Sequence, residues 1–344
     1  QLMPACGYLM TQRFGNRRKC RSERLLGGIG HAAIIPKGTL VYSLRACGSY
    51  RIGSYTIRGD LMLQTLLQNE TVIRLTVFFG VLAIVAGAEI ALPRRRLTAS
   101  KLRRWVSNLG IVFLNSALVR LILPATAAGF AVFAAQRGWG VFNVLDAPAW
   151  VGIIASVVIL DFAIYLQHVM FHAVPALWRL HRMHHADLDF DVTTGARFHP
   201  VEILLSMLIK FAVIAVIGAP AAAVIIFEVL LNATSMFNHG NFRLPAGLDR
   251  VLRLFVVTPD MHRVHHSIED HETNSNFGFN LPLWDRLLGT YKAQPDAGHE
   301  AMTIGIRDYR EPKLVSDLPG MLILPFLGRI TGYAINRRNW SGKP

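Results

Sequence analysis

Residues 201–237 read VEILLSMLIKFAVIAVIGAPAAAVIIFEVLLNATSMF, and this stretch decides the fold. It is almost entirely apolar, and it is too long for a single bilayer crossing, which needs about 20 residues. Gly218, Ala219 and Pro220 lie near its middle, where glycine and proline interrupt a helix. The stretch therefore predicts two membrane spans, 201–217 and 219–237, joined by a tight turn.

Three further apolar runs precede this stretch, at 73–92, 109–135 and 147–167. The composition agrees with a membrane protein, because 52% of the 344 residues are hydrophobic and only 17% are charged. Soluble domains usually carry about 25% charged residues. Backbone groups in lipid must be satisfied internally, which favours helices. The sequence thus predicts an all-α fold, a polytopic bundle of four to five membrane helices with a helical cap.

The net charge of +14 could suggest nucleic-acid binding, but its distribution indicates a membrane protein. Residues 1–60 supply +8 of this charge, and the remaining +6 is concentrated beside the apolar runs. The charges at one such flank are Arg94, Arg95, Arg96, Lys101, Arg103 and Arg104. Basic residues next to spans are typical of membrane proteins, so we expect no nucleic-acid partner.

The ends of the chain differ from its middle. Residues 1–60 lack helical periodicity and hold all three cysteines, so we expect a disordered or non-native extension there. No cysteine is then left for iron–sulfur or thiolate–zinc chemistry in the remaining chain. We expect membrane helices over 61–146, a histidine-rich catalytic domain over 147–310, and an interfacial segment and tail over 311–344.

The basic loop 93–108 sets the expected orientation, because loops rich in Lys and Arg tend to be cytoplasmic. Counting crossings from this loop brings the histidines at 168–199, 239 and 262–271 to the same cytoplasmic face. The same topology places the basic residues 1–60 outside, which the rule disfavours. Either residues 1–60 are not native, or span 73–92 does not fully cross the membrane.

Thirteen histidines are present, and eleven of them lie between residues 168 and 271. Most fall in short boxes of the forms His-x-x-x-His and His-x-x-His-His. The candidate metal ligands are His168, His172, His181, His184, His185, His199, His239, His262, His265 and His266.

The spacing of these histidines favours metal binding on helices. Residues i and i+4 project from one helix face, so a His-x-x-His-His box can supply two metals from one helical turn. Neutral imidazole suits zinc, copper, iron and nickel. Structural zinc closes at four ligands and catalytic zinc commonly uses three, so the three boxes and His239 hold too many imidazoles for one ion. The sequence therefore predicts two metal ions that share about nine ligands.

Several motifs around the boxes resemble the fatty acid hydroxylase/sterol desaturase superfamily of membrane di-iron enzymes. The similarity covers about 147–292. The motifs that carry it are Asp161-Phe162-Ala163-Ile164-Tyr165, Arg197-Phe198-His199-Pro200-Val201-Glu202, Thr258-Pro259-Asp260-Met261-His262-Arg263-Val264-His265-His266, Asn276-Phe277-Gly278, and Leu283-Trp284-Asp285-Arg286-Leu287-Leu288-Gly289-Thr290-Tyr291. Many relatives carry His-x-x-x-His before the third box, but this chain has Ser235 and His239 there. That difference leaves a tenth ligand open, with His199 as a substitute.

The resemblance implies two iron ions, O₂ as co-substrate, and hydrogen abstraction from an unactivated C–H bond of a fatty acyl or sterol-like lipid taken from the bilayer. Hydroxylation is the first expectation and desaturation the alternative. With no flavin, haem or iron–sulfur motif in the sequence, we expect an external electron donor, a ferredoxin- or cytochrome b5-type reductase system.

Polar residues inside the spans form stripes, each on one helix face. The stripes are Asp161, Tyr165, His168 and His172; Glu228, Asn232, Ser235 and His239; and His199, Ser206 and Lys210. An ionisable side chain at mid-bilayer costs about 3 kcal/mol, so these stripes should face the bundle interior. Lys210 and Glu228 lie at similar depths and could pair.

Carboxylates and hydroxyls next to a metal site commonly orient the imidazole ligands. We therefore predict Asp161, Tyr165, Asn238 and Glu202 as catalytic or imidazole-orienting residues. Two other classes of protein remain as alternatives. A transition-metal transporter would place ligands deep in several helices, and a zinc-dependent hydrolase would need far fewer ligands.

Overall fold

The computed structural model describes residues 57–145 and 148–328, and within these residues the chain is helical with no β-strand beyond three isolated bridges. The predicted extension 1–60, its three cysteines and the tail after residue 328 lie largely outside the described residues. The expected all-α class is confirmed.

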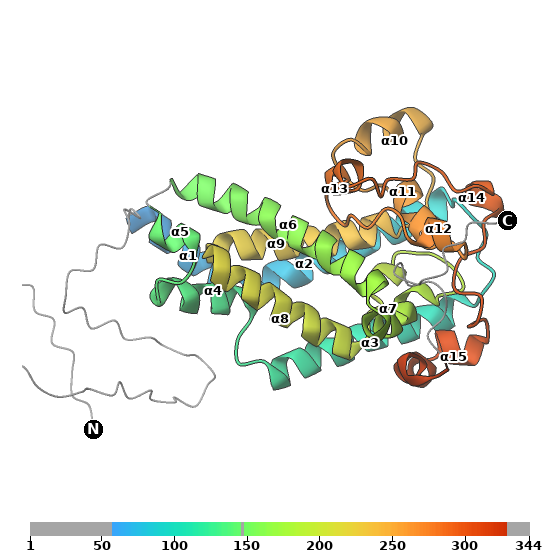
Figure 1. Ribbon diagram of the computed structural model, residues 1–344, viewed down its shortest axis with the longest axis horizontal. Coiled ribbons are helices and arrows are strands. Elements are labelled where there is room, and N and C mark those ends of the chain that lie inside the picture. Colours follow the sequence, from blue (N-terminus) through green and yellow to red (C-terminus); the bar gives the residue numbers. More distant parts are fainter. Residues whose placement is uncertain (1–56, 146–147, 329–344) are drawn as a thin grey trace, which may run out of the picture. The chain divides into compact units, whose positions relative to one another are not determined.

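Five helical stretches are long and apolar enough to cross a membrane, which confirms the predicted number of spans. They are Glu70–Ala91, Lys101–Gln136, Ala149–Ala173, Pro200–Ile217 and Ala221–Asn238. In Figure 1 the long helices lie beside one another, and the short helices α10 to α14 gather beyond the ends of α6 and α9.

The second stretch is two helices, so the expectation of one continuous span over 109–135 is wrong in this respect. It consists of α3 (Lys101–Ile122) and α4 (Ala127–Gln136). Pro124 causes the break, because proline disfavours the helical conformation of the residue before it, and Leu123 is extended at φ −94° and ψ 135°. Thr126 then begins α4 by accepting a hydrogen bond from the Gly129 amide.

The hairpin predicted from residues 201–237 is present as α8 (Pro200–Ile217) and α9 (Ala221–Asn238). Gly218 ends α8 in the left-handed conformation at φ +70°. Gly140 lies directly against this turn, and a Cβ added to it would come within 2.1 Å of the Gly218 nitrogen. The turn is therefore packed against the α4–α5 connection, where α5 is Val141–Val144.

The two legs of the hairpin are separated by other helices along much of their length. Both α4 and α6 (Ala149–Ala173) pack against α8 and against α9, and α2 (Glu70–Ala91) packs against α9. α1 (Ile57–Gln68) contacts α2 and α9. Lys210 of α8 and Glu228 of α9 form the predicted ion pair between the legs.

Beyond the spans, short helices build a cap. They are α7 (Pro175–His185), η1 (Thr194–Ala196), α10 (Ala246–Leu252), α11 (Pro259–His265), α12 (Asp270–Thr273), α13 (Leu283–Leu287), α14 (Gly298–Ala301), α15 (Pro312–Ser316), α16 (Leu318–Ile323) and η2 (Leu324–Phe326). α15 and α16 pack against α3, and Met321 and Leu324 join a buried cluster with Trp178. The described part of the C-terminal segment is thus packed on the cap, and its contact with a membrane surface stays a prediction.

Candidate metal centre

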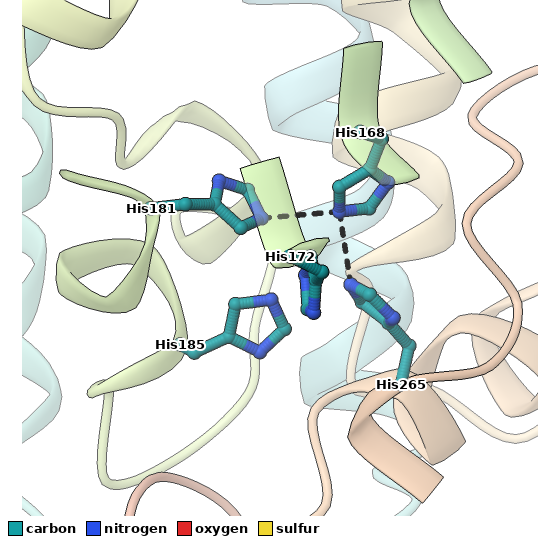
Figure 2. Close-up of side chains that lie close together, drawn as sticks. All are labelled: His168, His172, His181, His185 and His265. Carbon is teal, nitrogen blue, oxygen red and sulfur yellow. Dashed lines mark hydrogen bonds between the residues drawn. The ribbon is translucent and has the colours of Figure 1, made fainter. Parts of the chain in front are cut away.

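Ring nitrogens of five histidines lie within 4.8 Å of one another, and we call this set group A. Group A consists of His168 and His172 of α6, His181 and His185 of α7, and His265 of α11. Figure 2 shows the five rings turned toward one shared space, from three separate helices. All five side chains are buried.

Ring nitrogens of four more histidines also lie within 4.8 Å of one another, and we call this set group B. Its members are His184, His239, His262 and His266, all buried. The two groups are neighbours, because the rings of His185 and His266 stack with centroids 4.6 Å apart. Nine of the ten predicted ligands are thereby brought into two adjacent groups.

Each His-x-x-His-His box supplies both groups, as its spacing predicts. His181 and His185 are one helical turn apart and belong to group A, while His184 between them belongs to group B. In the other box, His262 and His266 belong to group B and His265 belongs to group A.

The tenth predicted ligand, His199, is not brought to either group. It lies at the start of α8, where its Nδ1 accepts a hydrogen bond from the Val201 amide at 3.2 Å. Its Nε2 lies 3.2 Å from the Leu322 carbonyl. The structure thus places His199 at a helix start, apart from the nine grouped histidines.

The orientation of the rings in group A fits a bound cation. His168 and His265 turn Nδ1 toward the carbonyls of Phe277 and Ser275, each at 2.7 Å, so each Nδ1 carries the proton. Their Nε2 atoms then hold lone pairs, yet they lie only 3.0 Å apart. The His181 Nε2 is also 3.0 Å from the His168 Nε2 (Figure 2, dashed). Lone pairs facing one another at this distance require a positive charge between them.

Group B shows the same arrangement. His184 and His239 turn Nδ1 toward the carbonyls of Arg197 and Ser235, at 3.1 and 2.7 Å. Their Nε2 atoms are 3.3 Å apart, and the His239 Nε2 is 3.1 Å from that of His266. Among the described residues, neither ring nitrogen of His262 has a hydrogen-bond partner.

Protons do not supply this positive charge. Burial lowers the pKa of His181 and of His239 to about 3. Burial, followed by the neighbouring histidines, lowers the pKa of His184, His185, His262, His265 and His266 well below the ordinary value. The rings are therefore neutral at pH 7, the form in which imidazole binds a metal. The residues present fit two metal ions.

One short segment, 274–278, orients three of the five rings in group A. Asn274 places its Oδ1 3.2 Å from the His172 Nδ1, and the carbonyls of Ser275 and Phe277 accept from His265 and His168. Hydrogen bonds of this kind fix which ring nitrogen is free to bind a metal. The motif Asn276-Phe277-Gly278 carries part of the family resemblance, but its position in the sequence did not predict this role.

Asp285 holds segment 274–278 in place. Its buried carboxylate accepts hydrogen bonds from the amides of Phe277 at 2.8 Å and Gly278 at 2.9 Å, and from the Thr290 hydroxyl at 2.7 Å. Burial raises the pKa of Asp285 to about 6, so the carboxyl is mainly ionised at pH 7. A Cβ at Gly278 would lie 2.8 Å from the Asp285 Oδ2, so this close approach requires glycine.

The predicted catalytic carboxylates occupy different places. Glu202 accepts a hydrogen bond from the His181 Nδ1 at 2.7 Å, so it orients a ring of group A. The structure shows no hydrogen bond from Tyr165 or His168 to the Asp161 carboxylate. This carboxylate accepts from the Asn280 amide and the Trp284 indole, both at 2.8 Å. Asp161 thus ties α6 to the segment that follows residue 278.

The other two predicted residues also contact this part of the cap. The Tyr165 hydroxyl lies 2.9 Å from the Thr290 hydroxyl, which connects it to Asp285. Asn238 donates to the Phe279 carbonyl at 3.0 Å. Asp161, Tyr165 and Asn238 therefore all hold the segment between residues 277 and 290, and a direct catalytic role for them stays a prediction.

Residues 153–290 match the family model for fatty acid hydroxylases. This match confirms the resemblance to the fatty acid hydroxylase superfamily that the motifs carry. The matched region contains all nine grouped histidines.

Curated relatives match less than half of the chain. The ornithine lipid hydroxylase OlsE of Rhizobium tropici is 32% identical over 143 residues, 42% of each chain. The alkylglycerol monooxygenase of Homo sapiens is 25% identical over 45% of this chain and 34% of its own. The fatty acid hydroxylase vlmA of Lecanicillium sp is 27% identical over 41% of this chain and 42% of its own. The chain thus spans less than half the length of these relatives, and no solved structure matches it.

Proposed function

We propose that this protein is a membrane oxygenase that uses two iron ions, O₂ and external electrons to hydroxylate an unactivated C–H bond of a lipid. The observation that carries the proposal is the pair of adjacent histidine groups at the end of a helical bundle. The relatives support it, because their names describe an ornithine lipid hydroxylase, an alkylglycerol monooxygenase and a fatty acid hydroxylase.

The nine histidines would hold the two ions, five around one and four around the other. Iron at such sites supplies reductive activation of O₂ and abstraction of a hydrogen atom from the substrate. The protein's own part is to fix the rings and keep water away. Glu202 and segment 274–278 fix the rings of group A, while Phe198 stacks on His184 and Trp178 covers His172.

A cavity of about 320 Å³ reaches group A and would admit a lipid. His168 and His181 line one end of it, and the walls continue along α3, α6, α8 and α9 between the spans. A substrate in this cavity would lie partly among apolar side chains, as an acyl chain requires. Such access from the bilayer favours a lipid over a water-soluble substrate.

The geometry disfavours the transporter alternative. The grouped histidines come from helix ends and from the cap, where their rings face one another in closed sets, and they do not line a path through several spans. Desaturation begins with the same hydrogen abstraction, but the names of the relatives favour hydroxylation. We further propose that the groups face the cytoplasm, where a ferredoxin- or cytochrome b5-type donor could reach the cap.

The test combines metal analysis with isotope incorporation. Purified protein loaded with Fe(II) should hold two irons per chain, and with a surrogate ferredoxin reductase system under ¹⁸O₂ it should add one labelled oxygen to membrane lipids. His265→Ala should lose iron and activity, whereas His271→Ala, outside both groups, should keep both. One iron per chain, or unlabelled lipids at full iron loading, would contradict the proposal.

A further inference from the structure

The cavity described above ends in charged residues at the side away from the histidines. Arg74, Lys210 and Glu228 all line it. Glu228 accepts from Lys210 through one carboxylate oxygen and from Arg74 through the other, the latter at 2.7 Å. Arg74 also donates to Glu70 at 2.7 Å. A chain of four charged groups thus lies within the spans, where isolated charges are costly.

Helix α8 lines both ends of the cavity and so sets the distance between the four charged groups and group A. Lys210 lies eight residues after Glu202, the partner of His181, along α8. Eight residues of α-helix rise about 12 Å, so the charges lie roughly two turns from group A. A lipid that fills the cavity can touch both ends at once.

Lys210 has hydrogen-bonding capacity left over. A lysine ammonium group has three N–H donors. Among the described residues, the only oxygen acceptor of the Lys210 Nζ is Glu228, and its other contact is the Met207 sulfur at 3.8 Å. Lys210 is only 8% exposed, so little of it is accessible from outside the protein. A buried donor without a partner is costly, which favours an oxygen acceptor from a ligand in the cavity.

The charges also restrict the kind of acceptor. Arg74 and Lys210 are balanced by Glu70 and Glu228, so the four groups together are neutral. A free carboxylate would add an uncompensated negative charge in a medium of low dielectric constant, which is unfavourable. A neutral amide, ester or hydroxyl oxygen accepts from Lys210 without this penalty.

The cavity is open toward the surroundings of the spans. Ser116 of α3 and Asn232 of α9 both line it, and both are exposed. α8 and α9 are separated here, with the Lys210–Glu228 pair between them. A lipid can therefore enter sideways and meet polar side chains, including Gln167 and Ser206, which bond to each other at 3.1 Å.

We propose that Lys210, held by Glu228 and Arg74, binds a neutral oxygen acceptor of the lipid substrate, such as an amide or ester carbonyl, and so disfavours free fatty acids. This inference rests on the proposed function for its identification of the cavity ligand as a substrate. The part of the lipid that lies at group A would then be about 12 Å from that carbonyl.

Binding measured without turnover tests this proposal. Hexadecanamide, palmitate and hexadecane differ only in the head group, and each competes against dansyl-undecanamide bound to the purified full chain in detergent. The wild type should bind hexadecanamide at least about tenfold more tightly than hexadecane, because hexadecane offers no acceptor to the charged donor. Palmitate should bind more weakly than hexadecanamide. This comparison needs no variant, so it holds even if a variant fails to fold.

Variants test whether the preference for hexadecanamide depends on Lys210 and Glu228. Lys210→Met with Glu228→Gln should lose roughly tenfold in hexadecanamide affinity and leave hexadecane binding unchanged. Lys210→Arg should retain the preference, and Arg120→Met, a charge removed from the exposed face of α3, should behave as wild type. Tighter binding of palmitate by the wild type, or an unchanged amide preference in the double variant, would overturn the proposal. Iron content and ¹⁸O incorporation are measured separately, so failure here leaves the proposed function intact.

Discussion

Asp285→Asn is the substitution that tests most directly how the cap controls the metal centre. The Asp285 carboxylate accepts three hydrogen bonds, two of them from the amides of Phe277 and Gly278. Asparagine has nearly the same shape but keeps only one acceptor oxygen, and its amide group would point a donor at a donor. The loss is equivalent to about one hydrogen bond to a charged group, about 1.5–3 kcal/mol.

This loss should be felt at His168, because the Phe277 carbonyl that accepts from its Nδ1 belongs to the segment that Asp285 holds. Groups that orient metal-binding histidines typically change metal affinity or activity by roughly 10–100-fold. That range corresponds to about 1.4–2.7 kcal/mol, in agreement with the hydrogen-bond figure. We therefore expect the iron in group A to bind roughly 10–100-fold more weakly.

The assay is iron retention during titration with a chelator, followed by metal analysis of the protein. The variant should pass through a species with one iron per chain at chelator concentrations where the wild type keeps two. Asp308→Asn, which changes an exposed carboxylate of the cap, serves as the control and should match the wild type. Wild-type iron retention together with a lowered melting temperature would refute the reasoning, because Asp285 would then only stabilise the fold. Simultaneous loss of both irons would refute the assignment of its effect to group A.

Three further predictions follow from other contacts. Glu202→Gln should change iron affinity less than tenfold, because the amide oxygen can still accept from His181, whereas Glu202→Leu should weaken it by roughly 10–100-fold in the same titration. Glu228→Gln should destabilise the protein, and adding Lys210→Met should recover part of the loss in thermal denaturation, since the two groups form an ion pair; strictly additive effects would show that they are not coupled. Gly140→Ala should lower the unfolding free energy by about 1–3 kcal/mol or prevent folding, because its Cβ would meet the backbone of the α8–α9 turn; a melting temperature equal to that of the wild type would contradict this packing.

Much of the bundle could be predicted because bilayer solvation acts on every residue of a span. The apolar runs predicted the spans, and Gly218 predicted the turn between α8 and α9. The break between α3 and α4 was missed, although Pro124 was visible, because a proline can also be accommodated within a continuous membrane helix.

The metal centre was predictable to the extent that it depends on helix periodicity. The spacing predicted that a His-x-x-His-His box can supply two metals, and each such box does contribute histidines to both groups. His199 shows the limit of this reasoning, because its ring turns to the backbone at the start of α8. Likewise, Asp161 lies on the same helix face as His168, but its carboxylate turns toward Asn280 and Trp284. Side-chain direction at such positions depends on the cap, which has no periodic pattern.

Segment 274–278 orients two metal-binding rings with main-chain carbonyls, which limits how substitutions in it can affect the ligands. Every residue carries a carbonyl oxygen, so exchanges at Ser275 and Phe277 leave the acceptors for His265 and His168 chemically intact. The hydrogen bonds to these two rings depend instead on the groups that fix the backbone of the segment. The most important are the Asp285 carboxylate and Gly278, which allows the close approach to it. Exchanges at the two buried positions, Ser275 and Phe277, are therefore limited by packing and not by the hydrogen bonds to the metal-binding rings.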